Sequence, residues 1–94
     1  MLSIKTETDG SVSLAGRLDA AQTDAAANQF RELQGAVTVN LAGLEYISSA
    51  GLGLFIGLHQ RLSAAGGSLT LVGMSDHVRH IFRLVRLDKV LNIQ

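Results

Sequence analysis

Apolar and polar residues follow one another along this chain in two kinds of pattern, and the shorter pattern predicts β-strands. Residues 36–41 alternate apolar and polar side chains and are rich in β-branched residues, which favours a strand. Residues 2–8, 12–18 and 68–74 are also short and apolar enough to form strands. The dipeptide Asp9-Gly10 separates the first two strands and is typical of a hairpin turn.

Apolar side chains recur every three or four residues in the other pattern, which predicts three helices. In the first helix, Asp19 and Gln22 resemble a capping box, and Gly35 is placed to end the helix. Its apolar stripe consists of Ala26, Phe30 and Leu33. The second helix opens at Ser48 or Ser49 and stops at Gly66-Gly67. Its apolar face consists of Leu52, Phe55, Ile56, Leu58, His59 and Leu62.

The third helix follows the Ser75-Asp76 cap, and residues 89–93 then form a short extended tail or strand. The apolar stripe of this third helix consists of Val78, Ile81, Phe82 and Val85. Strands that alternate with helices imply crossover connections and parallel strand pairing. We therefore expect an α/β fold, with a mixed, mostly parallel central sheet of four to five strands, an edge hairpin and three main helices.

Composition narrows the function classes. Apolar residues make up 47% of the 94-residue chain and charged residues 17%, which argues against disorder. Cysteine is absent, so disulfides, thiolate catalysis and cysteine-ligated zinc are excluded, and the cytoplasm is the expected compartment. No apolar run approaches the roughly 20 residues of a membrane span, so we expect no direct membrane insertion.

Charge is unevenly distributed, although the formal net charge is zero. Residues 1–47 carry a net charge of −3, and residues 48–94 carry +3. Nucleic-acid binding without sequence preference needs a strong basic field, so a protein partner is expected rather than a nucleic acid. We find no paired carboxylates, no Ser-His-Asp arrangement and no phosphate-binding loop with lysine, and we expect the protein not to be an enzyme.

The most informative segment is Ser48-Ser49-Ala50-Gly51-Leu52-Gly53, where a strand gives way to a helix. In open α/β folds this end of the sheet usually carries the functional site. A phosphate on a serine here would be accepted by the unpaired N–H groups of the helix start, and it would add about −1.5 to −2 charges to the surface. The alternative is that one serine only caps the helix, which stabilises it by about 1 kcal/mol.

Residues 40–53 resemble the signature of the STAS domain, the family that includes antagonists of bacterial anti-sigma factors. Its usual form is a strand ending in Asp or Asn, a variable turn, an aromatic or apolar pair, and then Asp-Ser-Ser/Thr/Ala-Gly-Leu-Gly. Three further segments resemble the family in the same order, and the match covers essentially the whole chain. They are Gly16-Arg17-Leu18-Asp19, the stretch from Arg61 to Leu71, and the closing Leu87-Asp88-Lys89-Val90-Leu91-Asn92-Ile93.

The resemblance implies a single STAS-like domain over residues 1–94, and since a cofactor motif is missing we expect no cofactor. The resemblance makes Ser49 the phosphoacceptor, because the family's acceptor is the serine directly after the motif's Asp, and that Asp falls on Ser48. Ser48 is a secondary candidate. The family works by partner switching: the unphosphorylated antagonist binds an anti-sigma factor with serine kinase activity, phosphorylation releases it, and a serine phosphatase resets it. The residues expected to bind the partner are Arg17, Asp19, Ser48, Ala50, Gly51 and Leu54.

Other interpretations remain beside this one. Some STAS proteins are subunits of membrane transporters, including lipid-transport ATPases, and work without phosphorylation; the serine at position 48 in place of Asp leaves room for that role. Gly51, Gly53 and Gly57 depart from a dinucleotide fingerprint by one residue of spacing. His77 and His80 have a spacing that suits two metal ligands, but a third ligand is lacking, and we expect no metal. Arg79, Arg83 and Arg86 form either a solvated face or a docking surface for an acidic partner.

Overall fold

The computed structural model describes all 94 residues and arranges five strands in one sheet. The order across the sheet is β1-β2-β3-β4-β5, in which β1 is antiparallel to β2 and every other pair is parallel. The strands are β1 (Leu2–Thr6), β2 (Val12–Leu18), β3 (Ala36–Ile47), β4 (Ser68–Val72) and β5 (Asn92–Ile93). The predicted α/β class, the mostly parallel sheet and the edge hairpin are confirmed.

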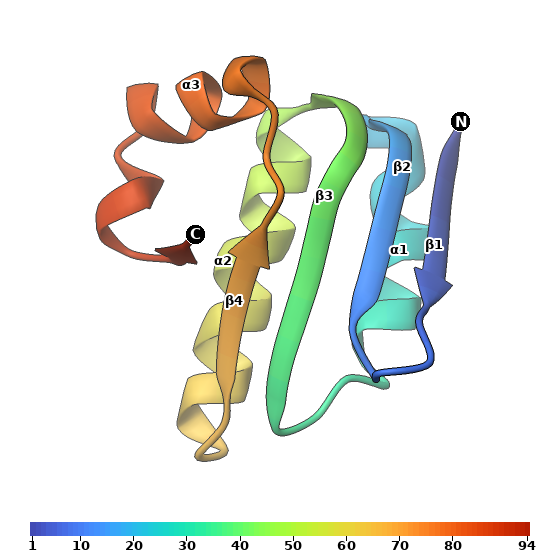
Figure 1. Cartoon of the computed structure of the whole chain (residues 1–94), viewed down its shortest axis with the longest axis vertical. Coiled ribbons are helices and arrows are strands. Elements are labelled where there is room, and N and C mark those ends of the chain that lie inside the picture. Colours follow the sequence, from blue (N-terminus) through green and yellow to red (C-terminus); the bar gives the residue numbers. More distant parts are fainter.

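Three α-helices and two short 3₁₀ helices connect the strands. They are η1 (Ala20–Gln22), α1 (Thr23–Phe30), α2 (Ser49–Ala64), α3 (Asp76–Leu84) and η2 (Leu87–Lys89). Helices α1 and α2 run along one face of the sheet, and α3 lies at the end of the molecule where α2 begins (Figure 1). None of the helices combines the length and apolar character needed to cross a membrane.

The β1–β2 hairpin turns at the predicted dipeptide. Gly10 adopts a φ of +89°, which costs a glycine little. The carboxylate of Asp9 accepts hydrogen bonds from the Ser11 backbone N–H at 2.9 Å and from the Ser11 hydroxyl at 2.7 Å. These bonds favour the charged form, so they hold the pKa of the Asp9 carboxyl below its usual value.

Strand β3 is twice the length that its alternating pattern predicted. The predicted end at Leu41 is wrong, because the strand continues to Ile47. Its pairing with β2 shifts register twice, between Ser13 and Ala15 and between Gly16 and Arg17. Such irregularities add residues to one strand and interrupt the alternation of side chains between faces. The last residues of the long β3 therefore lie beside the end of β2, at the same end of the sheet.

The start and end of α1 also differ from the prediction. Asp19 precedes η1 rather than an α-helix, and its side chain makes no capping hydrogen bond. The helix ends at Phe30, so the predicted extension to Leu33 is wrong. The Arg61 guanidinium on α2 donates to the carbonyl oxygens of Phe30 at 2.8 Å and Leu33 at 2.9 Å. Arg61 thereby adds donors to carbonyls at the end of α1, of which that of Phe30 also accepts the Leu33 N–H at 3.1 Å.

Helices α2 and α3 begin where the sequence predicted. Ser48 caps α2 and Ser75 caps α3, each by accepting a hydrogen bond from a backbone N–H three residues later. In α3, Val78 and Phe82 are buried, but Val85 is 49% exposed. The helix ends at Leu84 and Arg86 takes a left-handed φ of +62°, so the chain turns away before Val85 can reach the core.

The hydrophobic core lies between the sheet and the helices. It consists of 21 buried apolar residues and includes no buried polar or charged side chain. The Phe55 ring is fully buried at its centre, with its centroid 5.8 Å from that of Phe30 and 6.3 Å from that of Phe82. One aromatic cluster therefore ties α1, α2 and α3 together.

Candidate functional site

The strand-to-helix junction after β3 is built around Ser48. Its backbone is extended, with φ −89° and ψ 171°, and its Oγ accepts the Gly51 N–H at 3.1 Å. Its own N–H donates to the Leu18 carbonyl oxygen of β2 at 2.9 Å. Both the side chain and the backbone N–H of Ser48 make hydrogen bonds, and the residue is only partly exposed. Ser48 therefore acts as a helix cap.

Ser49 occupies the first position of α2 and is exposed, as is Ala50 beside it. No acidic residue lies in the first turn of this helix. The N-terminal end of a helix carries partial positive charge and N–H donors without intrahelical partners. The hydroxyl predicted to accept phosphate is therefore accessible, and it stands where a phosphate would be electrostatically favoured.

Gly51 fixes how closely α2 approaches the strands beneath it. The residue is buried, and a Cβ atom added there would lie 2.9 Å from Cγ1 of Ile47 and 2.9 Å from Cγ of Leu18. Gly53, two residues on, is exposed with open space around it. Gly51 therefore allows α2 to pack closely on the strands. The partner contact predicted for Gly51 remains a prediction, and its backbone atoms would have to make that contact.

Arg17 lies near the end of β2, and Asp19 directly follows that strand. Arg17 pairs in register with Tyr46 and places its guanidinium carbon 4.4 Å from the centre of the Tyr46 ring. This cation–π contact holds the charge at the surface. Asp19 is half-buried, and its Oδ1 atom is buried without a hydrogen-bond partner in the chain. A buried carboxylate oxygen without a donor is costly, and the partner contact expected of Asp19 remains a prediction.

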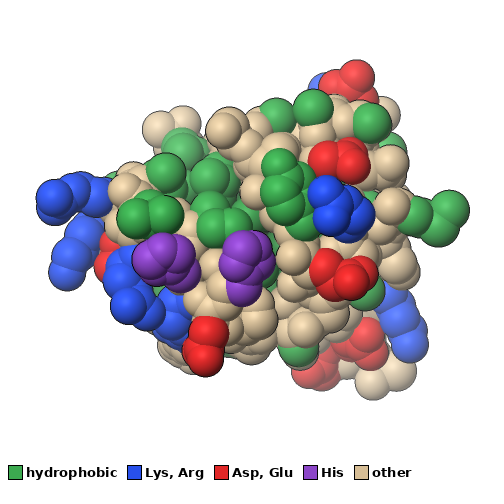
Figure 2. All heavy atoms as spheres, turned by 90° about the horizontal axis from the view of Figure 1, so that it is seen from above, with side chains coloured by type: hydrophobic (Ala, Val, Ile, Leu, Met, Phe, Trp, Pro, Cys, Tyr) green, Lys and Arg blue, Asp and Glu red, His purple; other side chains and the backbone are tan.

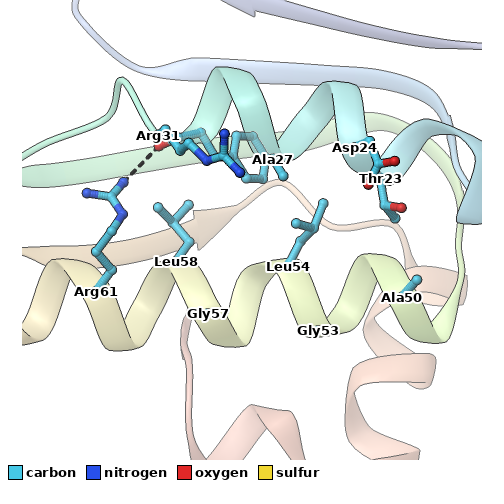
Figure 3. Close-up of a pocket in the computed structure, with 11 residues that line it drawn as sticks. Thr23, Asp24, Ala27, Arg31, Ala50, Gly53, Leu54, Gly57, Leu58 and Arg61 are labelled. Carbon is cyan, nitrogen blue, oxygen red and sulfur yellow. Dashed lines mark hydrogen bonds between the residues drawn. The ribbon is translucent and has the colours of Figure 1, made fainter.

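A groove between α1 and α2 begins at the same end of the molecule. It has a volume of about 420 Å³, and its wall from α2 includes Ala50 and Leu54. In Figure 3, Leu54 and Leu58 point from α2 toward α1, with Ala50 near one end and Arg61 at the other. Leu54 is half-buried and packs on the core, so it presents only part of its side chain to the groove.

The structure brings the predicted residues together at one end of the sheet. It also places there residues that the sequence analysis did not predict. Tyr46 supports Arg17, and Thr23, Asp24 and Arg31 line the groove from α1. A signal for the groove was present, since Gly53 and Gly57 fall on one side of α2 and leave room there. These two glycines indicate a groove only when α1 is known to lie along the same side of α2.

Substitution of Ser48 separates its capping role from any chemical role. We expect Ser48→Ala to lower the free energy of unfolding by about 1 kcal/mol, because the Gly51 N–H loses its acceptor. We expect Ser48→Asp to be at least as stable as the unmodified protein, since aspartate caps equally well and its charge favours the helix start. Urea denaturation measures both. Equal losses for the two variants would contradict the capping role.

Comparison with known proteins identifies the family. The model of the family described as "Mlab, STAS domain" matches residues 3–92, so the chain belongs to the STAS family. The expected family is therefore confirmed.

Individual relatives carry a consistent description. The chain is 29% identical over 92 residues to the anti-sigma-B factor antagonist of Bacillus subtilis, covering 95% of this chain and 84% of the relative. It is 33% identical over 57 residues to the protein of the same name from Staphylococcus epidermidis, and there the match spans about half of that relative (53%).

Solved structures show the same fold. An anti-sigma factor antagonist from Mycobacterium paratuberculosis superposes with a TM-score of 0.85 at 20% identity, covering 99% of this chain and 85% of that one. The anti-sigma factor antagonist SpoIIAA in its unphosphorylated form gives 0.72 at 19% identity, covering 100% of this chain and 87% of that one. The phosphorylated form of SpoIIAA gives a TM-score of 0.71.

Proposed function

We propose that this protein is a cytoplasmic anti-sigma factor antagonist that works by partner switching, with Ser49 as its phosphorylated residue. Unphosphorylated, it binds an anti-sigma factor that is also a serine kinase, and phosphorylation of Ser49 releases it. A serine phosphatase restores the binding form. The protein is then a regulatory binding module and a kinase substrate, with no catalytic residues of its own.

The observation that carries the proposal is the exposure of Ser49 at the first position of α2, beside a half-buried capping serine. Of the two hydroxyls in the motif, Ser49 is the one that a kinase can reach without breaking a cap. A relative that matches along 95% of this chain is an anti-sigma-B factor antagonist, and a structure with this fold is known in phosphorylated form. Both support this function.

The proposed switch acts through charge rather than refolding. A phosphate on Ser49 would add about −1.5 to −2 charges beside the groove and beside Arg17 and Asp19. A partner whose surface complements the unphosphorylated protein would meet added negative charge and a bulky group. The helix start accommodates the phosphate, so the fold survives while the interface is lost.

Two substitutions at Ser49 test the proposal directly. We expect Ser49→Ala to bind the kinase-type anti-sigma factor normally and to take up no phosphate from ATP. We expect Ser49→Asp to bind at least about tenfold more weakly, a loss of about 1.4 kcal/mol, because it places permanent charge in the interface. Isothermal titration calorimetry and a radiolabelled phosphate assay provide the measurements.

The matched control is Ser63→Asp, which adds the same charge on an exposed serine near the far end of α2. It should bind the partner as the unmodified protein does. If Ser49→Asp bound as tightly as Ser63→Asp, the switch would be wrong. Phosphate uptake by Ser49→Ala would instead move the acceptor to another residue, with Ser48 first in line.

A second candidate function is a constitutive subunit of a membrane transport complex. The observation that favours it is Ser48, which replaces the Asp of the switching motif. In that role both Ser49 variants would assemble with the transporter alike, and purified kinase would leave the protein unmodified. The phosphorylation assay therefore separates the two functions.

A further inference from the structure

The end of α3 and the η2 turn form a surface that the proposed switch does not use. Four large apolar residues of the chain are exposed, and three of them lie within residues 84–90: Leu84 at 69%, Val85 at 49% and Val90 at 53%. Apolar side chains exposed singly need no explanation, but three within seven residues make this segment a candidate interaction surface.

Three cations and one acidic residue, Asp88, alternate with these aliphatic side chains along residues 83–90. Arg83, Arg86 and Lys89 are exposed, and the arginines that donate side-chain hydrogen bonds within the chain are others, namely Arg31, Arg61 and Arg79. In Figure 2 several Lys and Arg side chains gather at the left end of the molecule, which is the α3 and η2 end in Figure 1, while others lie elsewhere on this face. We call residues 83–90 the basic–aliphatic patch.

The backbone conformation of Arg86 is a second, independent observation on this segment. Arg86 is the one non-glycine residue with positive φ, at +62°. Glycine is the usual residue just past the end of a helix in this conformation, because a Cβ atom is disfavoured there. The sequence keeps an arginine at a conformational cost, at a position where its guanidinium makes no hydrogen bond within the chain.

The shape of the patch favours one kind of occupant. The three hollows of the molecule are lined only by residues between Ile4 and Val72, so no hollow adjoins the patch. Protein interfaces depend on side chains that fill pockets, whereas a bilayer surface accommodates protruding side chains without a matching cavity. A second copy applied to the same patch would bring cations against cations. Anionic headgroups complement the charge, and the acyl boundary accepts Leu84 and Val90.

We propose that the basic–aliphatic patch is a peripheral contact surface for an anionic lipid bilayer. The contact takes place at the headgroup level and requires no spanning segment. It uses none of the residues proposed to bind the anti-sigma factor. A bilayer of anionic lipid attracts each nearby Lys or Arg by about 1 kcal/mol, which corresponds to about fivefold in partition for each charge removed.

Co-sedimentation with phospholipid vesicles tests this proposal. We expect the full chain to sediment with vesicles that contain phosphatidylglycerol and not with pure phosphatidylcholine vesicles, and to dissociate as salt is raised. The pair Arg83→Gln/Lys89→Gln should lower the partition on the order of 25-fold. The matched pair Lys5→Gln/Arg31→Gln, which removes the same charge elsewhere, should leave it unchanged.

Arg86→Gly separates binding from folding. Glycine suits the left-handed backbone, so the urea midpoint should stay or rise while vesicle partition falls about fivefold. The proposal is overturned if phosphatidylglycerol vesicles bind no more protein than phosphatidylcholine vesicles, or if both glutamine pairs lose partition equally. It is also overturned if the patch variants leave vesicle binding intact and weaken binding to the anti-sigma factor, because the patch is then a protein interface.

Discussion

Replacing Phe55 with alanine is expected to lower the free energy of unfolding by about 3–5 kcal/mol. The ring is fully buried between those of Phe30 and Phe82, so its removal leaves a cavity that three helices line. A domain of this size has about 5–15 kcal/mol of stability in total. The substitution therefore removes a large share of it, and urea denaturation followed by circular dichroism gives the value.

Leu84→Ala is the matched control for this prediction. It also removes a large apolar side chain from a helix, but Leu84 is 69% exposed and fills no space in the core. We expect a change within about 0.5 kcal/mol. A loss below about 1 kcal/mol for Phe55→Ala would mean that the three-ring cluster does not hold the helices together.

The order of the elements was predictable from the sequence because local signals agreed with one another. The caps at Ser48 and Ser75 and the Gly66 stop all coincide with helix ends in the structure. The position of Ser49 followed from the same local geometry, since a capping serine places the next residue at the first helical position. The local pattern left the choice between Ser48 and Ser49 open, and the family resemblance alone made Ser49 the expected phosphoacceptor.

Features that depend on contacts distant in sequence were not predictable. The length of β3 was missed because register shifts against β2 replace the alternation that marks a strand. The unpaired Asp19 oxygen was also missed. The residue type and spacing predicted a helix cap, but they do not show whether a backbone N–H comes within hydrogen-bond distance of the side chain. The α1–α2 groove was missed because it is formed by two helices, each of which looks ordinary alone.

Exposure at the end of α3 shows the same limit. Val85 continues the three-and-four spacing of Val78 and Phe82, so the sequence placed it in the core. The left-handed Arg86 redirects the chain and leaves Val85 at the surface. The basic–aliphatic patch consequently became visible only once the helix end was known.

Replacing Gly51 with leucine is expected to lower the free energy of unfolding by about 3 kcal/mol and to displace the start of α2. The first atom of the new side chain would already lie 2.9 Å from Ile47 and Leu18, and Leu18 is fully buried. Overpacking of a filled core typically costs about 1–3 kcal/mol, and a whole leucine side chain lies at the upper end of that range. Because Ser48 and Ser49 sit on the displaced turn, partner binding should fall with stability.

Gly53→Leu provides the control, since it makes the same exchange two residues further along α2, where the added Cβ meets nothing within 4 Å. Leucine is a better helix former than glycine, so this variant should be as stable as the unmodified protein or gain up to about 1 kcal/mol. Urea denaturation distinguishes the two. If Gly51→Leu proved as stable as Gly53→Leu, the close packing of α2 on the ends of β2 and β3 would not be what sets the position of Ser49.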